Sequence, residues 1–158
     1  LKKYALSIIK ILKKKNSKII FEPGRSIIGD TAILITQIIY VKEGHKKDFV
    51  ILDAAMNDLM RPALYGAKHR TVPAIKNKYF SKKTYEFVGP ICESTDRFAT
   101  IKKFQKLNEK DNVVICDVGA YGTSLASNCN VRPKPLEIII KNSKIQILKK
   151  RQKLSELM

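Results

Sequence analysis

The sequence predicts a mainly β fold: an antiparallel β-barrel or sandwich domain over residues 31–148, preceded by one helix-strand unit over residues 1–30. Two observations predict it. After residue 30 the chain contains six short apolar runs, with polar turn signals between them and few helical interruptions. Before residue 30, an amphipathic helical pattern leads into a short apolar run and a glycine-containing loop, which is the order of an α/β unit.

The amino-terminal pattern predicts one helix and one strand. Over residues 4–14, apolar side chains recur close to the helical period and lysines occupy the other face. The run Lys18-Ile19-Ile20-Phe21 is short and β-branched and leads directly into Glu22-Pro23-Gly24-Arg25. A parallel strand needs neighbouring strands and covering helices, so one such unit is not stable alone. We therefore expect the amino end to be truncated.

The later segments predict the sheet domain element by element. The expected strands are Ala32–Val41, Phe49–Asp53, Thr84–Val88, Val113–Val118, Leu136–Ile140 and Ile145–Leu148. Turn signals separate them, the last being Asn142-Ser143. Short helical pieces are expected at residues 57–64 and 97–98, and a basic amphipathic helix over residues 149–158 is expected to close the chain.

Composition narrows the classes of partner. The 158 residues carry a formal net charge of +17, which can indicate nucleic acid or an anionic membrane surface. However, 25 of the 31 basic residues are lysines, which are spread through loops and both ends, and no helix concentrates arginine. No apolar run reaches about 18 residues without Lys or Gln. We therefore expect no nucleic-acid partner and no membrane span.

The cysteines and histidines indicate a reducing compartment and no metal. Cys92, Cys116 and Cys129 are odd in number and lack CxxC spacing, as in a cytoplasmic protein with free thiols. His45 and His69 have no partner at ligand spacing. Both are interpreted as surface residues.

Two upstream segments carry residues suited to anion binding. Glu22-Pro23-Gly24-Arg25 combines a glycine that a ligand can approach closely with a guanidinium that can bind phosphate or carboxylate. Arg61 and Tyr65 are four residues apart, so a helical turn would place both on one face and could hold a carboxylate. Taken singly, the segments also fit a tight turn with a surface Arg and a Tyr at the edge of the core.

Two downstream segments carry a thiol, a carboxylate and a phenol. Cys92 and Glu93 follow a turn at Gly89-Pro90; a thiol can donate a proton and a carboxylate can bind an ammonium group. In Gly119-Ala120-Tyr121-Gly122 the glycines allow a sharp turn that projects the ring into a cavity. Taken alone, these segments are explained better by an inert buried Cys and by a hairpin bend with a packed Tyr.

In combination, these segments resemble the carboxyl-terminal portion of the diaminopimelate decarboxylases, which are pyridoxal-phosphate enzymes of fold type III. The resemblance rests on residues 22–26, 53–65, 89–96, 119–122 and 127–133, in the order and spacing of that family, and it covers nearly the whole chain. Two positions depart from the family pattern. Cys129 stands where tyrosine is usual, and Lys134 replaces a frequent Arg.

The resemblance implies an enzyme in which a TIM (β/α)8 barrel precedes the sheet domain, so that residues 1–30 would be the final unit of that barrel. It implies pyridoxal 5'-phosphate as cofactor, contacted by Glu22, Pro23, Gly24, Arg25 and Tyr121. It implies meso-diaminopimelate as substrate, bound by Arg25, Arg61, Tyr65, Glu93 and Tyr121, with L-lysine as product. Cys92, reaching across a homodimer with shared active sites, would be the catalytic proton donor.

The same resemblance implies that the chain is inactive alone. The family lysine that forms the Schiff base, the histidine that stacks on the cofactor ring and the glycine-rich phosphate loop all belong to the barrel. Without that lysine, the Schiff base that joins the resting enzyme to its cofactor cannot form. Either a second polypeptide supplies the barrel, or the chain is a remnant of a broken gene.

Two other functions remain open at this point. An ornithine or arginine decarboxylase would share Glu22 to Arg25, although such relatives typically have Cys-Asp-Gly where this chain has Cys92-Glu93-Ser94. A non-enzymatic basic β-barrel module that binds nucleic acid or an anionic surface would explain the net charge, and its affinity would fall steeply with salt.

Overall fold

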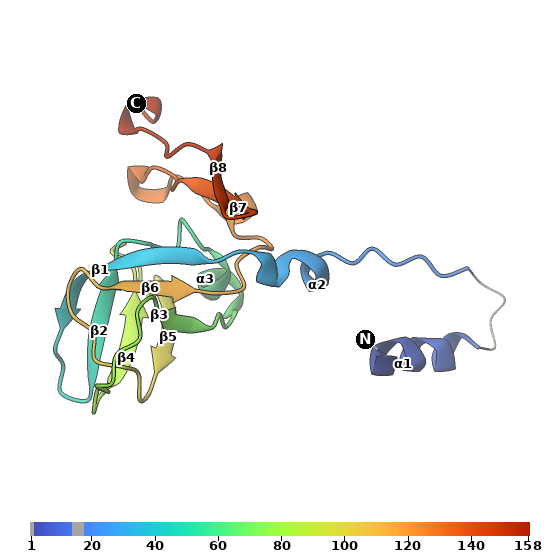
Figure 1. Cartoon of the computed structure of the whole chain (residues 1–158), viewed down its shortest axis with the longest axis horizontal. Helices are drawn as coiled ribbons and strands as arrows, with labels where there is room; N and C mark the ends of the chain where they lie inside the picture. Colours follow the sequence, from blue (N-terminus) through green and yellow to red (C-terminus); the bar gives the residue numbers. More distant parts are fainter. Residues whose placement is uncertain (1, 14–17) are drawn as a thin grey trace.

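A six-stranded, barrel-like sheet forms the body of the protein in a computed structural model that describes residues 2–13 and 18–158. Its strands lie in the order β3-β6-β1-β2-β4-β5 (Figure 1). They are β1 (Leu34–Lys42), β2 (Lys47–Leu52), β3 (Thr71–Pro73), β4 (Thr84–Val88), β5 (Arg97–Ile101) and β6 (Asn112–Ile115). The mainly β fold class is thus confirmed.

One pair of strands departs from the antiparallel expectation. The pairs β1–β2, β1–β6, β3–β6 and β4–β5 are antiparallel, whereas β2 and β4 run parallel. A parallel pair needs a long crossover, and here the connection from β2 to β4 contains α3 (Arg61–Tyr65) and β3. This crossover brings Arg61 to one end of the sheet.

The core lies inside the curved sheet and is rich in aromatic residues. Tyr85 and Phe87 alternate along β4 and meet Phe104 in edge-to-face contacts, with ring centroids 5.2 to 6.4 Å apart. Ile38, Val50, Leu52, Val113 and Ile115 add fully buried aliphatic side chains from β1, β2 and β6.

Two elements differ from expectation within this sheet. The short helix expected at residues 97–98 is wrong, because these residues begin β5, where pairing with β4 buries Phe98. The edge strand β3, which has three residues and ends in Pro73, was not predicted. The helix expected over residues 57–64 is limited to α3, and residues 55–58 form a turn before it.

The amino-terminal helix is confirmed as α1 (Lys2–Leu12); residue 14 of the expected helix lies outside the described residues. The strand expected at residues 18–21 is absent, since residues 18–24 have no regular structure and are exposed. A parallel strand needs neighbours, and no described strand lies beside this segment. Figure 1 shows α1 apart from the sheet; α2 (Arg25–Ile28) and a 3-10 turn, η1 (Gly29–Thr31), then lead into β1.

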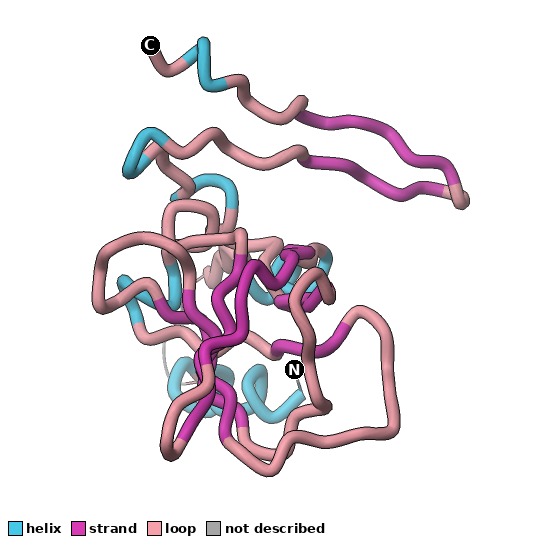
Figure 2. The backbone as a smooth tube through the Cα atoms, turned by 90° about the vertical axis from the view of Figure 1, so that its left-hand side faces the viewer, coloured by secondary structure: helices cyan, strands magenta, loops and turns pink. Residues whose placement is uncertain are grey.

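The carboxyl-terminal part is a separate hairpin. The expected strands are confirmed as β7 (Glu137–Lys141) and β8 (Lys144–Lys149), joined at Asn142-Ser143, where both residues have positive φ. They form their own two-stranded sheet rather than joining the main sheet (Figure 2). Three further 3-10 turns are η2 (Thr123–Leu125), η3 (Cys129–Val131) and η4 (Leu154–Glu156).

The helix expected over residues 149–158 is wrong. Lys149 still belongs to β8, where it forms an ion pair with Glu137, and only η4 is helical beyond it. Gln152 holds the intervening chain extended, because its backbone N–H donates to the Lys134 carbonyl and its side-chain oxygen accepts from Lys134 N–H and Asn128 Nδ2.

Candidate functional site

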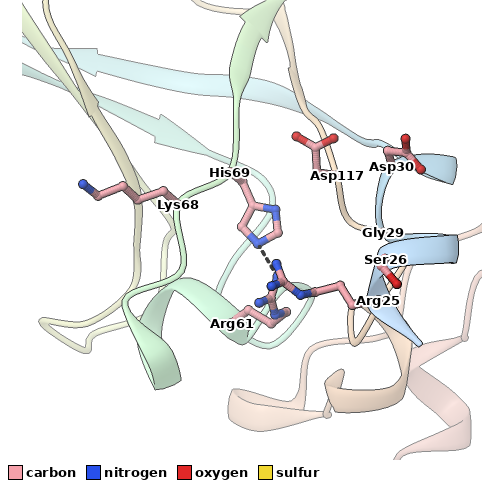
Figure 3. Close-up of a pocket in the computed structure, with 8 residues that line it drawn as sticks. All are labelled: Arg25, Ser26, Gly29, Asp30, Arg61, Lys68, His69 and Asp117. Atoms are coloured by element: carbon pink, nitrogen blue, oxygen red, sulfur yellow. Dashed lines mark hydrogen bonds between the residues drawn. The ribbon is translucent and has the colours of Figure 1, made fainter. Parts of the chain in front are cut away.

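A pocket of about 350 Å³ lies where α2 and η1 approach α3 and the ends of β3 and β6 (Figure 3). Segments far apart in the sequence line it, and most of the lining side chains are charged: Arg25, Ser26, Gly29, Asp30, Arg61, Lys68, His69 and Asp117.

A close backbone contact fixes the wall formed by α2 and η1. Val118 N–H donates to the Ala32 carbonyl at 3.1 Å and Gly119 N–H donates to the Gly29 carbonyl at 3.0 Å. A Cβ atom on Gly119 would collide with the Ile28 carbonyl oxygen. Glycine at position 119 therefore lets the turn after β6 pack directly against the segment that carries Arg25.

A buried histidine fixes the opposite wall. His69 is 7% exposed; its Nδ1 lies 3.0 Å from the Cys116 carbonyl oxygen and its Nε2 lies 3.4 Å from Arg61 Nη1. Arg61 Nε is buried and has no hydrogen-bond partner among the described residues. A buried donor without a partner is unfavourable, so this atom is suited to receive an acceptor from a ligand.

The charges of the pocket favour an anion. Arg25, Arg61 and Lys68 contribute three cations, against the carboxylates of Asp30 and Asp117. Guanidinium groups bind carboxylate and phosphate through paired hydrogen bonds. The residues present thus fit an oxyanion group, which a dicarboxylic amino acid and pyridoxal phosphate both carry.

Of the expected site residues, the structure brings Arg25 and Arg61 together in this pocket and leaves the others outside its lining. Tyr65 ends α3 and is 65% exposed, and Tyr121 is 54% exposed in a turn with φ of 59°. Glu22, Pro23 and Gly24 are exposed in the segment before α2.

Cys92 and Glu93 lie in the exposed loop between β4 and β5. Glu93 Oε1 accepts hydrogen bonds from Thr95 N–H at 3.1 Å and from the hydroxyls of Ser94 and Thr95 at 3.2 Å. The Thr95 N–H bond, followed by the two hydroxyls, lowers the pKa of the Glu93 carboxyl. Glu93 therefore presents an ionised carboxylate, and Cys92 presents a free thiol beside it.

Asp96 anchors this loop. Its Oδ2 accepts from Ile91 N–H at 2.8 Å and its Oδ1 accepts from Met56 N–H at 2.7 Å. Burial raises the pKa of the Asp96 carboxyl, against the opposing effect of these two hydrogen bonds. A Cβ atom on Gly89 would collide with this carboxylate. The Cys92 loop is thereby held against the segment that leads to Arg61.

That segment is also held from the carboxyl-terminal side. Arg132 Nε donates to Asn57 Oδ1 at 3.0 Å, and Ser127 N–H donates to the Asn57 carbonyl at 2.9 Å. Asn57 is fully buried, and burial raises the pKa of the neighbouring Asp58 carboxyl. The segments 53–65 and 127–133, which both carry the family resemblance, thus form one hydrogen-bonded unit.

Sequence reasoning missed His69, which is buried in the pocket rather than on the surface. It has no neighbouring ligand residue in the sequence, and the short strand β3 that follows it gave no signal. Asp117 was missed as a site residue although it directly follows a buried strand run and has a φ of 62°.

The comparisons with known proteins agree with this arrangement. The family model described as pyridoxal-dependent decarboxylase, C-terminal sheet domain, matches residues 8–119. The chain belongs to the pyridoxal-dependent decarboxylase family. It is 44% identical over 156 residues to the diaminopimelate decarboxylase of Helicobacter pylori, and the match covers 98% of this chain and 38% of the relative.

Solved structures give the same family. The crystal structure of the Helicobacter pylori diaminopimelate decarboxylase complexed with L-lysine superposes with a TM-score of 0.83 at 42% identity, covering 98% of this chain and 38% of that one. The diaminopimelate decarboxylase of M. jannaschii superposes with a TM-score of 0.86 at 32% identity, covering 95% and 35%. The chain thus spans well under half the length of these relatives.

The described residues contain neither a membrane-spanning helix nor a cluster of metal ligands. No described helix is long and apolar enough to cross a membrane. No group of three or more His, Cys, Asp or Glu side chains in the described part of the chain is arranged to hold a metal ion.

Proposed function

We propose that this chain is the carboxyl-terminal part of a diaminopimelate decarboxylase, which converts meso-2,6-diaminopimelate to L-lysine. The observation that carries the proposal is the convergence of Arg25 and Arg61 on one pocket, with Arg61 Nε buried and without a partner in the described part of the chain. The match to the diaminopimelate decarboxylase of Helicobacter pylori over nearly the whole chain supports the choice within the family.

The substrate has two amino acid ends, and this chain would bind the end that does not react. The two guanidiniums of Arg25 and Arg61 hold its carboxylate, and Tyr65 adds a phenol. Glu93 holds the ammonium group, and the lowered pKa of its carboxyl keeps it charged. Binding one end tightly positions the other end for reaction.

The residues toward the cofactor are Glu22, Pro23, Gly24, Arg25 and Tyr121. When bound, pyridoxal phosphate withdraws electrons from the carbon that loses carbon dioxide. Cys92 then holds the proton that this carbon receives. Because Cys92 and the adjacent Glu93 both lie outside the lining of the Arg25 pocket, we propose that they serve the active site of a second subunit in a homodimer.

The remaining parts of the proposal concern the whole enzyme. Residues 1–30 would complete a (β/α)8 barrel that supplies the Schiff-base lysine, so the chain without that barrel is expected to be inactive. The three free cysteines are consistent with a cytoplasmic enzyme.

The test uses a chimera in which residues 1–158 replace the matching carboxyl-terminal portion of the Helicobacter pylori relative. We expect the chimera to release carbon dioxide and L-lysine from meso-diaminopimelate and to turn over L-ornithine far more slowly. Faster turnover of L-ornithine would assign the chain to the ornithine-type decarboxylases, and strong salt-sensitive binding of nucleic acid without turnover would favour the non-enzymatic module.

A further inference from the structure

We propose that His69, in its neutral form with the proton on Nδ1, is a positioning residue that orients the Arg61 guanidinium for anion binding and releases it when His69 is protonated. This inference rests on the proposed function, because it deepens the role of Arg61 in substrate recognition. It arises from the hydrogen bonds of buried His69 and partly buried Arg61.

The tautomer of His69 follows from its partners. A carbonyl oxygen can only accept a hydrogen bond, so Nδ1, which lies 3.0 Å from the Cys116 carbonyl oxygen, must carry a proton. Arg61 Nη1 can only donate, so Nε2, which lies 3.4 Å from it, must accept and carry none. His69 is therefore neutral and acts as a bridge from the end of β6 to α3 (Figure 3).

This bridge determines which edge of Arg61 remains for a ligand. With Nη1 occupied by His69, the edge formed by Nε and Nη2 is left, and Nε is buried and without a partner among the described residues. Two parallel N–H groups on that edge match the two oxygens of a carboxylate. His69 holds the guanidinium in one rotation, which reduces the conformational entropy lost when the anion binds.

Protonation of His69 would remove this arrangement. Nε2 would become a donor facing the Arg61 donor, and a second positive charge would be added beside the guanidinium. The other charged groups lining the pocket are Arg25 from α2, Asp30 from η1, Lys68 from the segment before β3 and Asp117 from the segment after β6. None of them accepts the Arg61 Nη1 hydrogen bond that His69 accepts. Acidification is therefore expected to loosen Arg61 and weaken anion binding.

The first experiment determines the tautomer directly. Long-range ¹H–¹⁵N correlation spectra of the 158-residue chain resolve the ring nitrogens of its two histidines, and exposed His45 serves as the internal reference. We expect His69 to show one protonated nitrogen, Nδ1, at neutral pH. A protonated Nε2, or a tautomer mixture like that of His45, would overturn the proposal.

The second experiment uses two variants that each keep one half of the bridge. In His69→Asn the side-chain amide can still donate to the Cys116 carbonyl, but no acceptor reaches Arg61. In His69→Gln the side-chain oxygen can still reach Arg61 and cannot be protonated. In the chimera, we expect His69→Asn to weaken L-lysine binding about tenfold, as for loss of a hydrogen bond to a charged group, and His69→Gln to remain within about threefold of the unchanged protein.

The pH dependence separates positioning from a merely structural role. L-lysine affinity of the unchanged chimera should fall on acidification, whereas His69→Gln should lose most of this dependence. Equal pH profiles in both proteins would overturn the proposal. Arg61→Gln serves as the reference. If Arg61→Gln leaves L-lysine affinity unchanged, the proposed function fails. If Arg61→Gln weakens L-lysine binding but His69→Asn does not, only the inference about His69 fails.

Discussion

The Asp96 carboxylate accepts the backbone N–H of Ile91 at 2.8 Å, so a residue at the end of the Cys92 loop fixes the backbone at the beginning of that loop. Its second oxygen accepts from Met56 N–H at 2.7 Å, which ties the loop to the segment before α3. Asp96 is 3% exposed. The geometry of the expected proton donor thus depends on a buried carboxylate that contacts neither cofactor nor substrate in the proposed mechanism.

Asp96→Asn should destabilise the protein by about 1–3 kcal/mol. The carboxylate of Asp96 accepts hydrogen bonds from two backbone N–H groups, and the asparagine amide would place its own NH2 donor against one of them. Urea unfolding of the chain measures this effect. Ser94→Ala, in the same loop but exposed, is the matched control and should change stability by less than about 0.5 kcal/mol. Equal stability of Asp96→Asn and the unchanged protein would show that the two hydrogen bonds are not needed.

The raised pKa of Asp96 predicts the sign of a pH effect. Folding makes this carboxyl bind a proton more readily, so its contribution to stability increases as pH falls through the folded pKa and is lost as pH rises. The free energy of unfolding of the unchanged protein minus that of Asp96→Asn should therefore increase from about pH 7 to about pH 4. A difference that shrinks on acidification would mean that the hydrogen bonds, rather than burial, dominate the pKa of Asp96.

Gly119→Ala and Gly24→Ala should affect different properties of the protein. A Cβ at position 119 meets the Ile28 carbonyl, so Gly119→Ala should cost about 1–3 kcal/mol of stability. Gly24 has open space around its Cβ position, but its φ of −111° and ψ of −92° lie outside the regions that alanine favours, so Gly24→Ala should cost less stability than Gly119→Ala rather than none. In the chimera, however, it should weaken pyridoxal phosphate binding by about tenfold if the loop approaches the cofactor closely. Unchanged cofactor affinity in Gly24→Ala would remove this loop from the cofactor site.

Glu93→Gln should raise the KM for meso-diaminopimelate by about tenfold or more and change kcat less, because it removes the charge proposed to bind the substrate ammonium. Steady-state kinetics of the chimera measure both constants. Thr95→Val keeps the Glu93 charge and removes one hydroxyl bond to it, so it should have a much smaller effect. A fall in kcat alone would instead place Glu93 at the reacting end of the substrate.

Particular residues show what the sequence could predict. Alternating apolar residues and turn residues such as Asn142-Ser143 predicted most strands, because local patterning and turn chemistry determine them. The parallel β2–β4 pair joins segments far apart in the sequence, so local patterns could not predict it. The strand beginning at Arg97 is short and is determined by its pairing with β4, which its own residues did not indicate. Arg25 and Arg61 were singled out by residue type and spacing and were assigned to one site through the family resemblance, whereas His69 was missed because its role depends on the Cys116 carbonyl, 47 residues away in the sequence.

The most direct test of the central claim compares two ligands that differ by one carboxylate. L-lysine retains the carboxylate that Arg25 and Arg61 are proposed to hold, whereas cadaverine lacks it. Calorimetric titration of the chimera should show at least about tenfold tighter binding of L-lysine, and Arg61→Gln should abolish this preference while leaving cadaverine affinity within about threefold. Equal binding of L-lysine by the Arg61→Gln variant and the unchanged chimera would contradict the account.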